Sequence, residues 1–169
     1  GTRSLGAPVR TLRVPHPVWL RDEGRHIVVL PANDFLVTYT LDRPDGSAET
    51  FHTPVARASY ASKVSAARTF CSVSDLERLV EAGLVRGGSL DTAVVYVDRD
   101  LSAAKKKKLA GALGYAGSRA LRPGTFMNSL RYRNECARHK ALDLIGDMAL
   151  LGVRLAAHVI ARGTGHTMD

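Results

Sequence analysis

The sequence predicts an α+β fold, a two-layer sandwich in which helices cover one face of a mixed sheet, with a small β-α-β unit inserted. The first third of the chain is rich in short β-prone runs, and the rest alternates helical and strand patterns. The longest helical pattern, at residues 135–151, is followed closely by a strand pattern at 155–161. This order of elements favours a sheet covered by helices on one side.

The length suits one ordinary domain or two very small ones, and the composition is that of a globular protein. The chain has 169 residues, of which 45% are hydrophobic and 24% are charged. No apolar run approaches the length needed to span a bilayer, and the two cysteines form neither a disulfide framework nor a zinc knuckle. A reducing, cytoplasmic setting is therefore expected. The net charge of +8 favours an anionic partner: a phosphorylated ligand, a nucleic acid or a membrane surface.

The first third of the chain is expected to form four strands, because each run combines β-prone residues with turn residues at its ends. These runs are residues 9–14, 26–30, 35–41 and 49–53. A helix is expected next, at 55–67, with Tyr60 and Val64 on its inner face.

Residues 71–97 are expected to form a compact β-α-β unit of the kind inserted as a lid or a wall. The run Ser-Asp-Leu-Glu at 74–77 has the pattern of a capping box, and the helix it opens ends at Gly83. This helix is expected to bury three apolar residues, which are Leu76, Leu79 and Val80. A tight turn at 87–89 then leads to a strand at 92–97.

Residues 98–128 are expected to form an insertion that contains a helix at 102–113 and a long glycine-containing loop. Four consecutive lysines, 105–108, lie in that helix. A solvated helix face explains them better than a nucleic-acid contact, because no aromatic residues are interleaved with them. No nucleic-acid partner is expected.

The helix predicted at 135–151 carries the clearest chemical signal in the chain. Within it, His139, Asp143 and Asp147 fall at i, i+4 and i+8, so an imidazole and two carboxylates share one face. These groups are donors that zinc accepts, and a spacing of four lets two of them converge on one ion. Taken alone, the pattern is more often an ion pair on a helix surface. A second polar cluster, at 162–166, follows downstream.

The ends of this helix are also predicted. Asn134 is expected as the N-cap and Gly152 as the residue that ends the helix. Cys136 lies one turn before His139, and a buried core thiol is expected there rather than a metal ligand.

Longer motifs around these residues resemble a known family. The run Arg-His-Lys-Ala-Leu-Asp-Leu-Ile-Gly-Asp at 138–147, followed by Gly-His at 165–166, closely resembles the C-terminal domain of UDP-3-O-acyl-N-acetylglucosamine deacetylase (LpxC). That family comprises zinc amidases that catalyse the committed step of lipid A biosynthesis. The resemblance also includes Ala-Arg-Thr-Phe at 67–70 and the segment 83–91. Because the motifs occur in the family's order, the whole chain is interpreted as this one domain.

The resemblance implies a metal centre and a set of catalytic residues. His139 and Asp143 correspond to two of the three protein ligands of zinc, and iron(II) is an alternative metal for such ligands. His166 corresponds to the histidine that stabilises the oxyanion and protonates the leaving amine. Asp147 corresponds to the carboxylate that orients this histidine, and Thr69 to the threonine beside the oxyanion.

The resemblance also implies contacts with the substrate. Phe70 corresponds to the aromatic residue against the sugar, and Lys140 and Arg162 to basic positions near the glucosamine and the diphosphate. Asp42 fits the pattern of the uracil site, whereas Arg43 replaces the aromatic residue that stacks on uracil, and a guanidinium can also stack on a base. The β-α-β unit at 71–97 corresponds to the family's acyl-chain passage. Its candidate binding residues are Val73, Leu76, Val85, Gly88 and Ser89.

Part of the family's active site has no counterpart in this chain. The N-terminal domain of the family supplies the third zinc-binding histidine and the glutamate base, and nothing in the sequence matches that domain. The resemblance therefore implies a chain that is inactive, or nearly so, until an N-terminal domain completes it in cis or as a separate chain. An exposed apolar face is expected where that domain docks.

Two interpretations of function remain open from the sequence. The first is zinc-dependent hydrolysis of the acetamide of UDP-3-O-acyl-N-acetylglucosamine, by a cytoplasmic enzyme that works at or near the inner-membrane surface. The alternative is a non-catalytic module of the same fold that binds a nucleotide-sugar or a protein.

Overall fold

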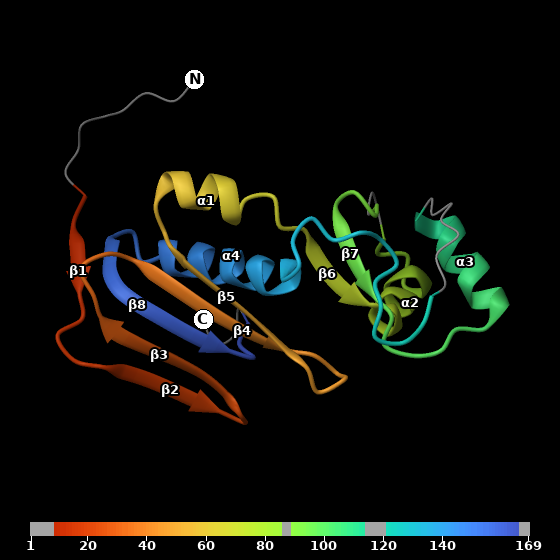
Figure 1. Cartoon of the computed structure of the whole chain (residues 1–169), viewed down its shortest axis with the longest axis horizontal. Helices are drawn as coiled ribbons and strands as arrows, with labels where there is room; N and C mark the ends of the chain where they lie inside the picture. Colours follow the sequence, from red (N-terminus) through yellow and green to blue (C-terminus); the bar gives the residue numbers. More distant parts are fainter. Residues whose placement is uncertain (1–8, 86–88, 114–120, 166–169) are drawn as a thin grey trace, which may run out of the picture.

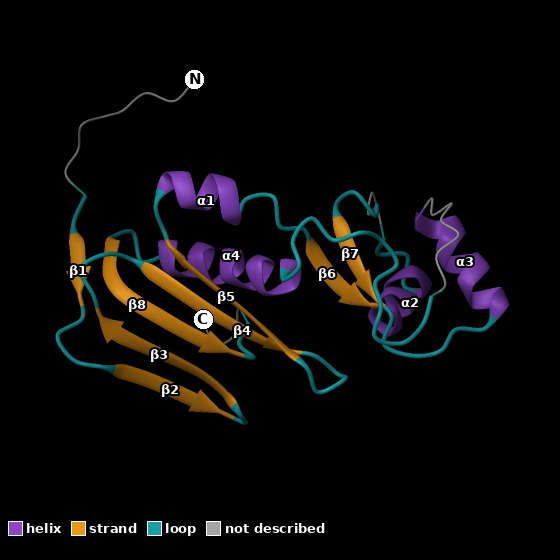
Figure 2. Cartoon of the chain, in the orientation of Figure 1, coloured by secondary structure: helices purple, strands orange, loops and turns teal. Residues whose placement is uncertain are grey.

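The computed structural model describes residues 9–85, 89–113 and 121–165. Its elements form two adjoining units, a larger one built on a mixed sheet and a smaller one built on a two-stranded sheet (Figure 1). The predicted α+β class, with helices on one face of a mixed sheet, is confirmed (Figure 2).

The main sheet has the strand order β2-β3-β8-β4-β5, and β1 also pairs with β8. The strands are β1 (Thr11–Arg13), β2 (Val18–Asp22), β3 (Arg25–Pro31), β4 (Leu36–Asp42), β5 (Ala48–Pro54) and β8 (Arg154–Arg162). The sheet is mixed because β8 runs parallel to β1 and β4 but antiparallel to β3. Four of its strands match the runs predicted at 26–30, 35–41, 49–53 and 155–161 to within a residue at each end.

Two helices lie on one face of this sheet (Figure 2): α1 (Arg57–Lys63) packs on β5, and α4 (Glu135–Ala149) packs on β4 and β5. Alternate residues of a strand face opposite sides of a sheet. In β8, Leu155, Ala157, Val159 and Ala161 accordingly face α4 and belong to the core. On α4 the fully buried apolar residues are Ala137, Ala141 and Leu144.

The smaller unit is a β-α-β arrangement, as the sequence predicts. Its parallel strands are β6 (Thr69–Ser72) and β7 (Ala93–Tyr96), and α2 (Val73–Glu81) connects them. The helix α3 (Ala103–Leu113) completes the unit. A second core forms here from Val73, Leu76, Val95, Val97, Leu101, Leu109, Leu121 and Met127. The segment interpreted as an insertion, 98–128, thus contributes several of these core residues.

Several local predictions are wrong. The strand β2 was not predicted, and it is an exposed edge strand whose Trp19 side chain is 72% exposed. The capping box of α2 consists of Ser72 and Asp75 rather than residues 74–77, because β6 ends at Ser72 and α2 begins at the next residue. Leu79 and Tyr60, predicted to be buried, are 38% and 37% exposed.

The bounds of α4 are close to those predicted, but the cap at its N-terminus differs from the prediction. Asn134 does not cap the helix with its side chain. Its amide donates to the Thr50 carbonyl at 2.9 Å and its side-chain oxygen accepts from Arg138 Nε at 2.8 Å, so it ties α4 to β5 instead. Gly152 has a φ of +66°, as expected of the residue that follows the end of a helix.

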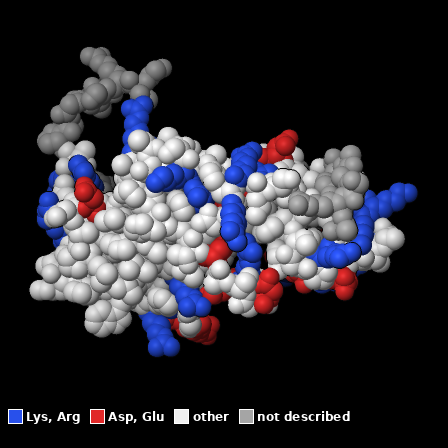
Figure 3. Space-filling model, viewed as in Figure 1, with Lys and Arg blue, Asp and Glu red and all other residues white. Residues whose placement is uncertain are grey.

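Charged residues are spread over both units, and basic side chains cluster over the end of the molecule that α3 forms (Figure 3). Lys105 lies 3.3 Å from the carboxylate of Glu77, which also pairs with Arg99, while Lys107 and Lys108 are exposed to solvent. In the described part of the chain, every helix is too short or too polar to cross a bilayer.

Candidate active site

The predicted metal ligands lie side by side in the middle of α4. His139 Nε2 is 3.5 Å from Asp143 Oδ1, and Lys140 Nζ donates to Asp143 Oδ2 at 3.1 Å. The three side chains keep only 15–18% of their surface exposed, so they are shielded but still accessible. The helical spacing of four therefore brings an imidazole nitrogen and a carboxylate oxygen together, as the sequence predicts.

A backbone contact fixes which nitrogen of His139 is available. His139 Nδ1 lies 3.2 Å from the Ala67 carbonyl oxygen. A carbonyl oxygen can only accept a hydrogen bond, so Nδ1 carries the proton in this contact, and in the neutral imidazole Nε2 then has the lone pair. This is the outer hydrogen bond typical of metal-binding histidines. In the described residues no cluster of three or more His, Cys, Asp or Glu could hold a metal ion. His139 and Asp143 thus offer two donors.

The loop after β8 reaches the same face of α4. A Cβ atom placed on Gly165 would lie 4.0 Å from Lys140 Nζ, and the Tyr39 hydroxyl donates to the Thr164 carbonyl at 2.6 Å. Asp147 follows Asp143 by one turn and is half-buried. His166 lies outside the described residues, one position beyond the last residue of this loop that the structure describes.

Phe70 lies on β6 of the smaller unit, at the side that faces the predicted metal ligands. Its ring meets the His139 ring edge-on, with the centroids 6.3 Å apart. Thr69 precedes it at the start of β6 and is exposed. The motif at 67–70 is therefore brought to α4 by tertiary structure, although some 70 residues separate the two in sequence.

One cavity, here called the insert cavity, extends from Phe70 into the smaller unit and has a volume of about 300 Å³. Its lining is mostly apolar and consists of Thr69, Phe70, Cys71, Leu76, Leu79, Leu84, Val85, Ser89, Ala93, Val95 and Leu113. Of the predicted passage residues, Leu76, Val85 and Ser89 line it. Val73 is fully buried in the second core and is absent from this lining, and Gly88 lies outside the described residues.

A second cavity, here called the junction cavity, occupies about 320 Å³ between the two units. It is lined by Leu41, Asp42, Arg43, Pro44, Phe70, Cys71, Ser72, Asp75, Tyr96, Phe126 and Cys136. Arg43 pairs with Glu49, and its guanidinium lies over the Phe126 ring, 5.3 Å from the centroid. Phe70 and Cys71 line both cavities.

Arg162 is not brought together with Lys140. It alternates with the core residues of β8 and so projects from the opposite face of the sheet. There its guanidinium donates to both carboxylate oxygens of Asp42, at 2.8 and 2.9 Å. These hydrogen bonds lower the pKa of Asp42 and raise that of Arg162.

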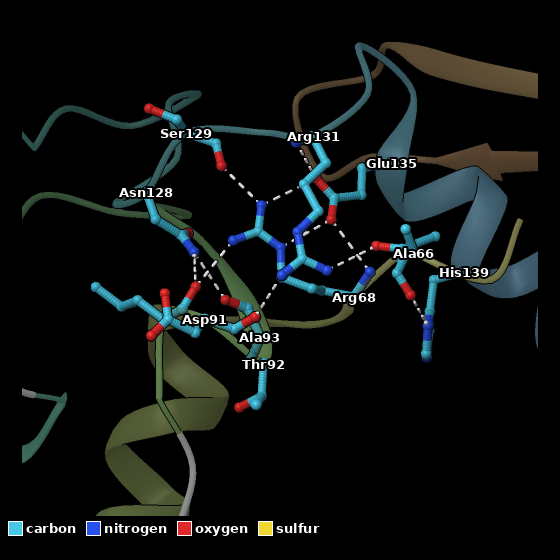
Figure 4. A network of polar contacts seen from close by, with 12 residues as sticks. Ala66, Arg68, Asp91, Thr92, Ala93, Asn128, Ser129, Arg131, Glu135 and His139 are labelled. Carbon is cyan, nitrogen blue, oxygen red and sulfur yellow. Dashed lines mark hydrogen bonds and ion pairs between the residues drawn. The ribbon is translucent and has the colours of Figure 1, made fainter. Parts of the chain in front are cut away.

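A buried ion pair that the sequence analysis missed supports the site (Figure 4). The carboxylate of Glu135 is fully buried and accepts from the Arg68 guanidinium, from the Arg68 backbone N–H and from the Arg131 backbone N–H. Arg68 also donates to the carbonyls of Leu90 and Ser129, which ties the smaller unit to the start of α4. Burial raises the pKa of Glu135, but the hydrogen bonds from Arg68 and Arg131 outweigh it, so its pKa lies below the ordinary value.

The chain is similar to known proteins over its whole length. A family model described as LpxC, UDP-3-O-acyl N-acetylglycosamine deacetylase, matches residues 1–112 and 99–169. The UDP-3-O-acyl-N-acetylglucosamine deacetylase of Leptospira biflexa is 33% identical, over 100% of this chain and 49% of the relative. The enzyme of the same description from Solibacter usitatus is 36% identical, over 99% of this chain and 50% of the relative.

A bifunctional relative is similar to this chain at a comparable identity. The bifunctional enzyme LpxC/FabZ of Bacteroides thetaiotaomicron is 35% identical, over 100% of this chain and 38% of the relative. The chain thus spans about half the length, or less, of these curated relatives. Because a family model matches the entire chain, this chain belongs to the LpxC family.

Proposed function

We propose that this chain forms one half of an active site that hydrolyses the acetamide of UDP-3-O-acyl-N-acetylglucosamine with the help of a bound zinc ion. The observation that carries this proposal is the convergence of His139 Nε2 and Asp143 Oδ1 beside Phe70, a residue that lines two cavities. The relatives that match the chain are described as deacetylases of this substrate.

The donor set fits zinc. His139 offers Nε2 because its Nδ1–H is held by the Ala67 carbonyl, and Asp143 offers Oδ1 because its Oδ2 accepts from Lys140. When bound, zinc lowers the pKa of a water ligand and polarises the carbonyl of an amide. The ammonium of Lys140 also keeps Asp143 from rotating away from His139.

The remaining residues of this face handle protons and the oxyanion. We assign the proton donor to His166 from the family motif, with Asp147 orienting it. Lys140 stands beside the loop that precedes His166, so the loop and the metal ligands share one positively charged neighbour. Thr69 is the first residue of the strand that carries Phe70. This position suits the role proposed for its hydroxyl, beside the reacting carbonyl.

The two cavities suit the two ends of the substrate. The insert cavity is mostly apolar and suits the acyl chain, whereas the junction cavity has charged and aromatic walls and suits the nucleotide. Phe126 provides an aromatic ring next to Arg43, at the place where the family's stacking residue is replaced. Arg43 and Phe126 together are therefore proposed to contact the base.

The half of the relatives that this chain does not cover is proposed to supply the third zinc ligand and the general base. Among the described residues, two uncovered apolar regions near α4 are available for it. One is a groove of about 670 Å³ between α1 and the end of α4, whose apolar walls include Phe35, Ile145 and Met148. The other is formed by Leu150 and Leu151, which are 85% and 52% exposed. Monomeric proteins rarely leave large apolar patches uncovered.

Val85→Phe should shorten the insert cavity. Each buried methylene contributes about 0.8 kcal/mol, so losing room for two of them should weaken binding of a long acyl chain roughly 15-fold. Titration with substrates of two acyl lengths measures the effect. Val80→Phe is the matched control, because Val80 lies in the same unit but does not line this cavity. Equal loss in both variants, or equal loss for both acyl lengths, would count against the assignment.

Phe126→Ala should weaken binding of free UDP about tenfold, since stacking of a base on an aromatic ring contributes roughly 1–3 kcal/mol. Calorimetric titration with UDP checks this. Tyr132→Ala is the control, because Tyr132 also lies under a guanidinium, that of Arg138, but lines neither cavity. Unchanged UDP affinity in Phe126→Ala would remove Phe126 from the proposed base site.

The proposal as a whole is tested by mixing this chain with the half of a relative that it does not cover and measuring release of acetate from the substrate. We expect zinc-dependent release from the mixture and little or none from either half. A folded mixture that binds substrate but releases no acetate would contradict the proposal and favour the non-catalytic alternative.

A further inference from the structure

One peptide group lies between two side chains of α4 (Figure 4). The Arg68 backbone N–H donates to Glu135 Oε1 at 3.1 Å, and the Ala67 carbonyl accepts from His139 Nδ1 at 3.2 Å. This N–H and this C=O belong to the same peptide group. In a trans peptide they point in opposite directions. Glu135 and His139 are one helical turn apart, so the group spans the distance between them.

The Glu135 carboxylate is itself held firmly. The described residues give it four hydrogen bonds, all from donors: Arg68 N and Nε on Oε1, and Arg68 Nη2 and Arg131 N on Oε2. The side chain is 0% exposed, so no water competes for these positions. Once Glu135 fixes the N–H end of the peptide, the C=O end has one direction left, toward His139.

We propose that Glu135 is a positioning residue for His139, acting through the Ala67–Arg68 peptide group. It holds the carbonyl that keeps the proton on His139 Nδ1, and so presents the lone pair of Nε2 beside Asp143. This inference rests on the proposed function for its purpose, but its geometry is independent of any metal. Carbonyl or carboxylate partners of metal-binding histidines commonly have this effect on the tautomer.

A neighbouring carboxylate, that of Glu49, offers a control that distinguishes a positioning role from a general structural role at the start of α4. Glu49 also contacts the start of α4, accepting from the Ala137 N–H at 2.7 Å, and it also pairs with an arginine, Arg43. No peptide group links Glu49 to His139 among the described contacts. Glu49→Gln therefore changes a partly buried ion pair at the same end of α4 without touching the proposed path.

The test compares Glu135→Gln with Glu49→Gln in the 169-residue chain labelled with ¹⁵N-histidine. A glutamine amide at 135 must face two N–H donors with its own NH₂, whichever way it turns. We expect the wild-type chain, without metal and at a pH where the imidazole is neutral, to show His139 protonated on Nδ1. Glu135→Gln should lose this preference and bind zinc 10- to 100-fold more weakly, while Glu49→Gln should keep both properties.

The inference is overturned if Glu135→Gln keeps the wild-type tautomer and only lowers the unfolding temperature, or if Glu49→Gln shifts the tautomer equally. Should Glu135→Gln fail to fold, the double variant Arg68→Leu, Glu135→Leu replaces the buried pair with apolar residues and gives the same readouts. Failure of the proposed function looks different: the wild-type tautomer is then as expected, but zinc does not bind.

Discussion

Glu135→Ala should lower the free energy of unfolding by about 3–5 kcal/mol, the range expected when one partner of a buried ion pair is removed. The loss leaves the Arg68 guanidinium without its carboxylate at a position that is only 8% exposed. It also releases the N–H groups of Arg68 and Arg131. Urea unfolding followed by circular dichroism measures the change.

The matched control is Asp42→Ala, which removes the carboxylate of the exposed pair with Arg162. Solvent screens that pair, so the midpoint of unfolding should stay close to that of the wild type. An equal shift of the midpoint in both variants would show that the buried pair has no special role in joining the two units.

The same pair should make stability depend on pH. The pKa of Glu135 in the folded chain lies below its ordinary value of 4.5, because the hydrogen bonds from Arg68 and Arg131 outweigh the effect of burial. The stabilisation is therefore complete above about pH 4.5 and is lost as the pH falls through the lowered folded-state pKa. In Glu135→Gln this loss of stability in acid should be smaller. Unfolding curves measured between about pH 3 and pH 6 test this.

His139→Ala should reduce acetate release by the assembled enzyme at least about 100-fold, because even changes outside the metal ligands commonly cost 10–100-fold in metal affinity or activity. Among the described residues, His139 carries the only imidazole on this face of α4, and the variant removes it. The unfolding temperature is measured alongside, because the side chain is only 18% exposed and packs on Phe70.

His52→Ala serves as the control for loss of an imidazole. His52 lies on β5, contacts Thr38 and is exposed, away from α4. We expect nearly full activity from this variant. Substantial acetate release by His139→Ala at saturating zinc would mean that His139 is not a metal ligand.

Much of the fold follows from local patterns in the sequence. The strands β3, β4, β5 and β8 have β-prone runs bounded by turn residues, and the apolar face of α4 recurs at helical spacing. The i, i+4 spacing of His139 and Asp143 is also enough to predict their contact, because a helix determines it locally. By contrast, β2 has no covered face, so its sequence carries no alternation from which to recognise it.

The unpredicted parts of the site depend on contacts between distant segments. Arg68 and Glu135 each look like surface residues, since burial of a charge depends on a partner 67 positions away. Phe126 reaches Arg43 only because residues 121–128 pack beside β7. The placement of Arg162 could have been predicted from the sequence, because His158 and Arg162 alternate with apolar residues along β8. They therefore lie on the face of the sheet opposite α4.

Zinc binding measured by calorimetry, on this chain alone and after addition of the half of a relative that the chain does not cover, tests the proposed composite site most directly. Wild type and His139→Ala are compared in both states. We expect weak binding by the chain alone, much tighter binding by the assembled pair, and none by His139→Ala. Tight binding by the chain alone would place a third ligand within these 169 residues, and absence of binding in both states would contradict a zinc site at His139 and Asp143.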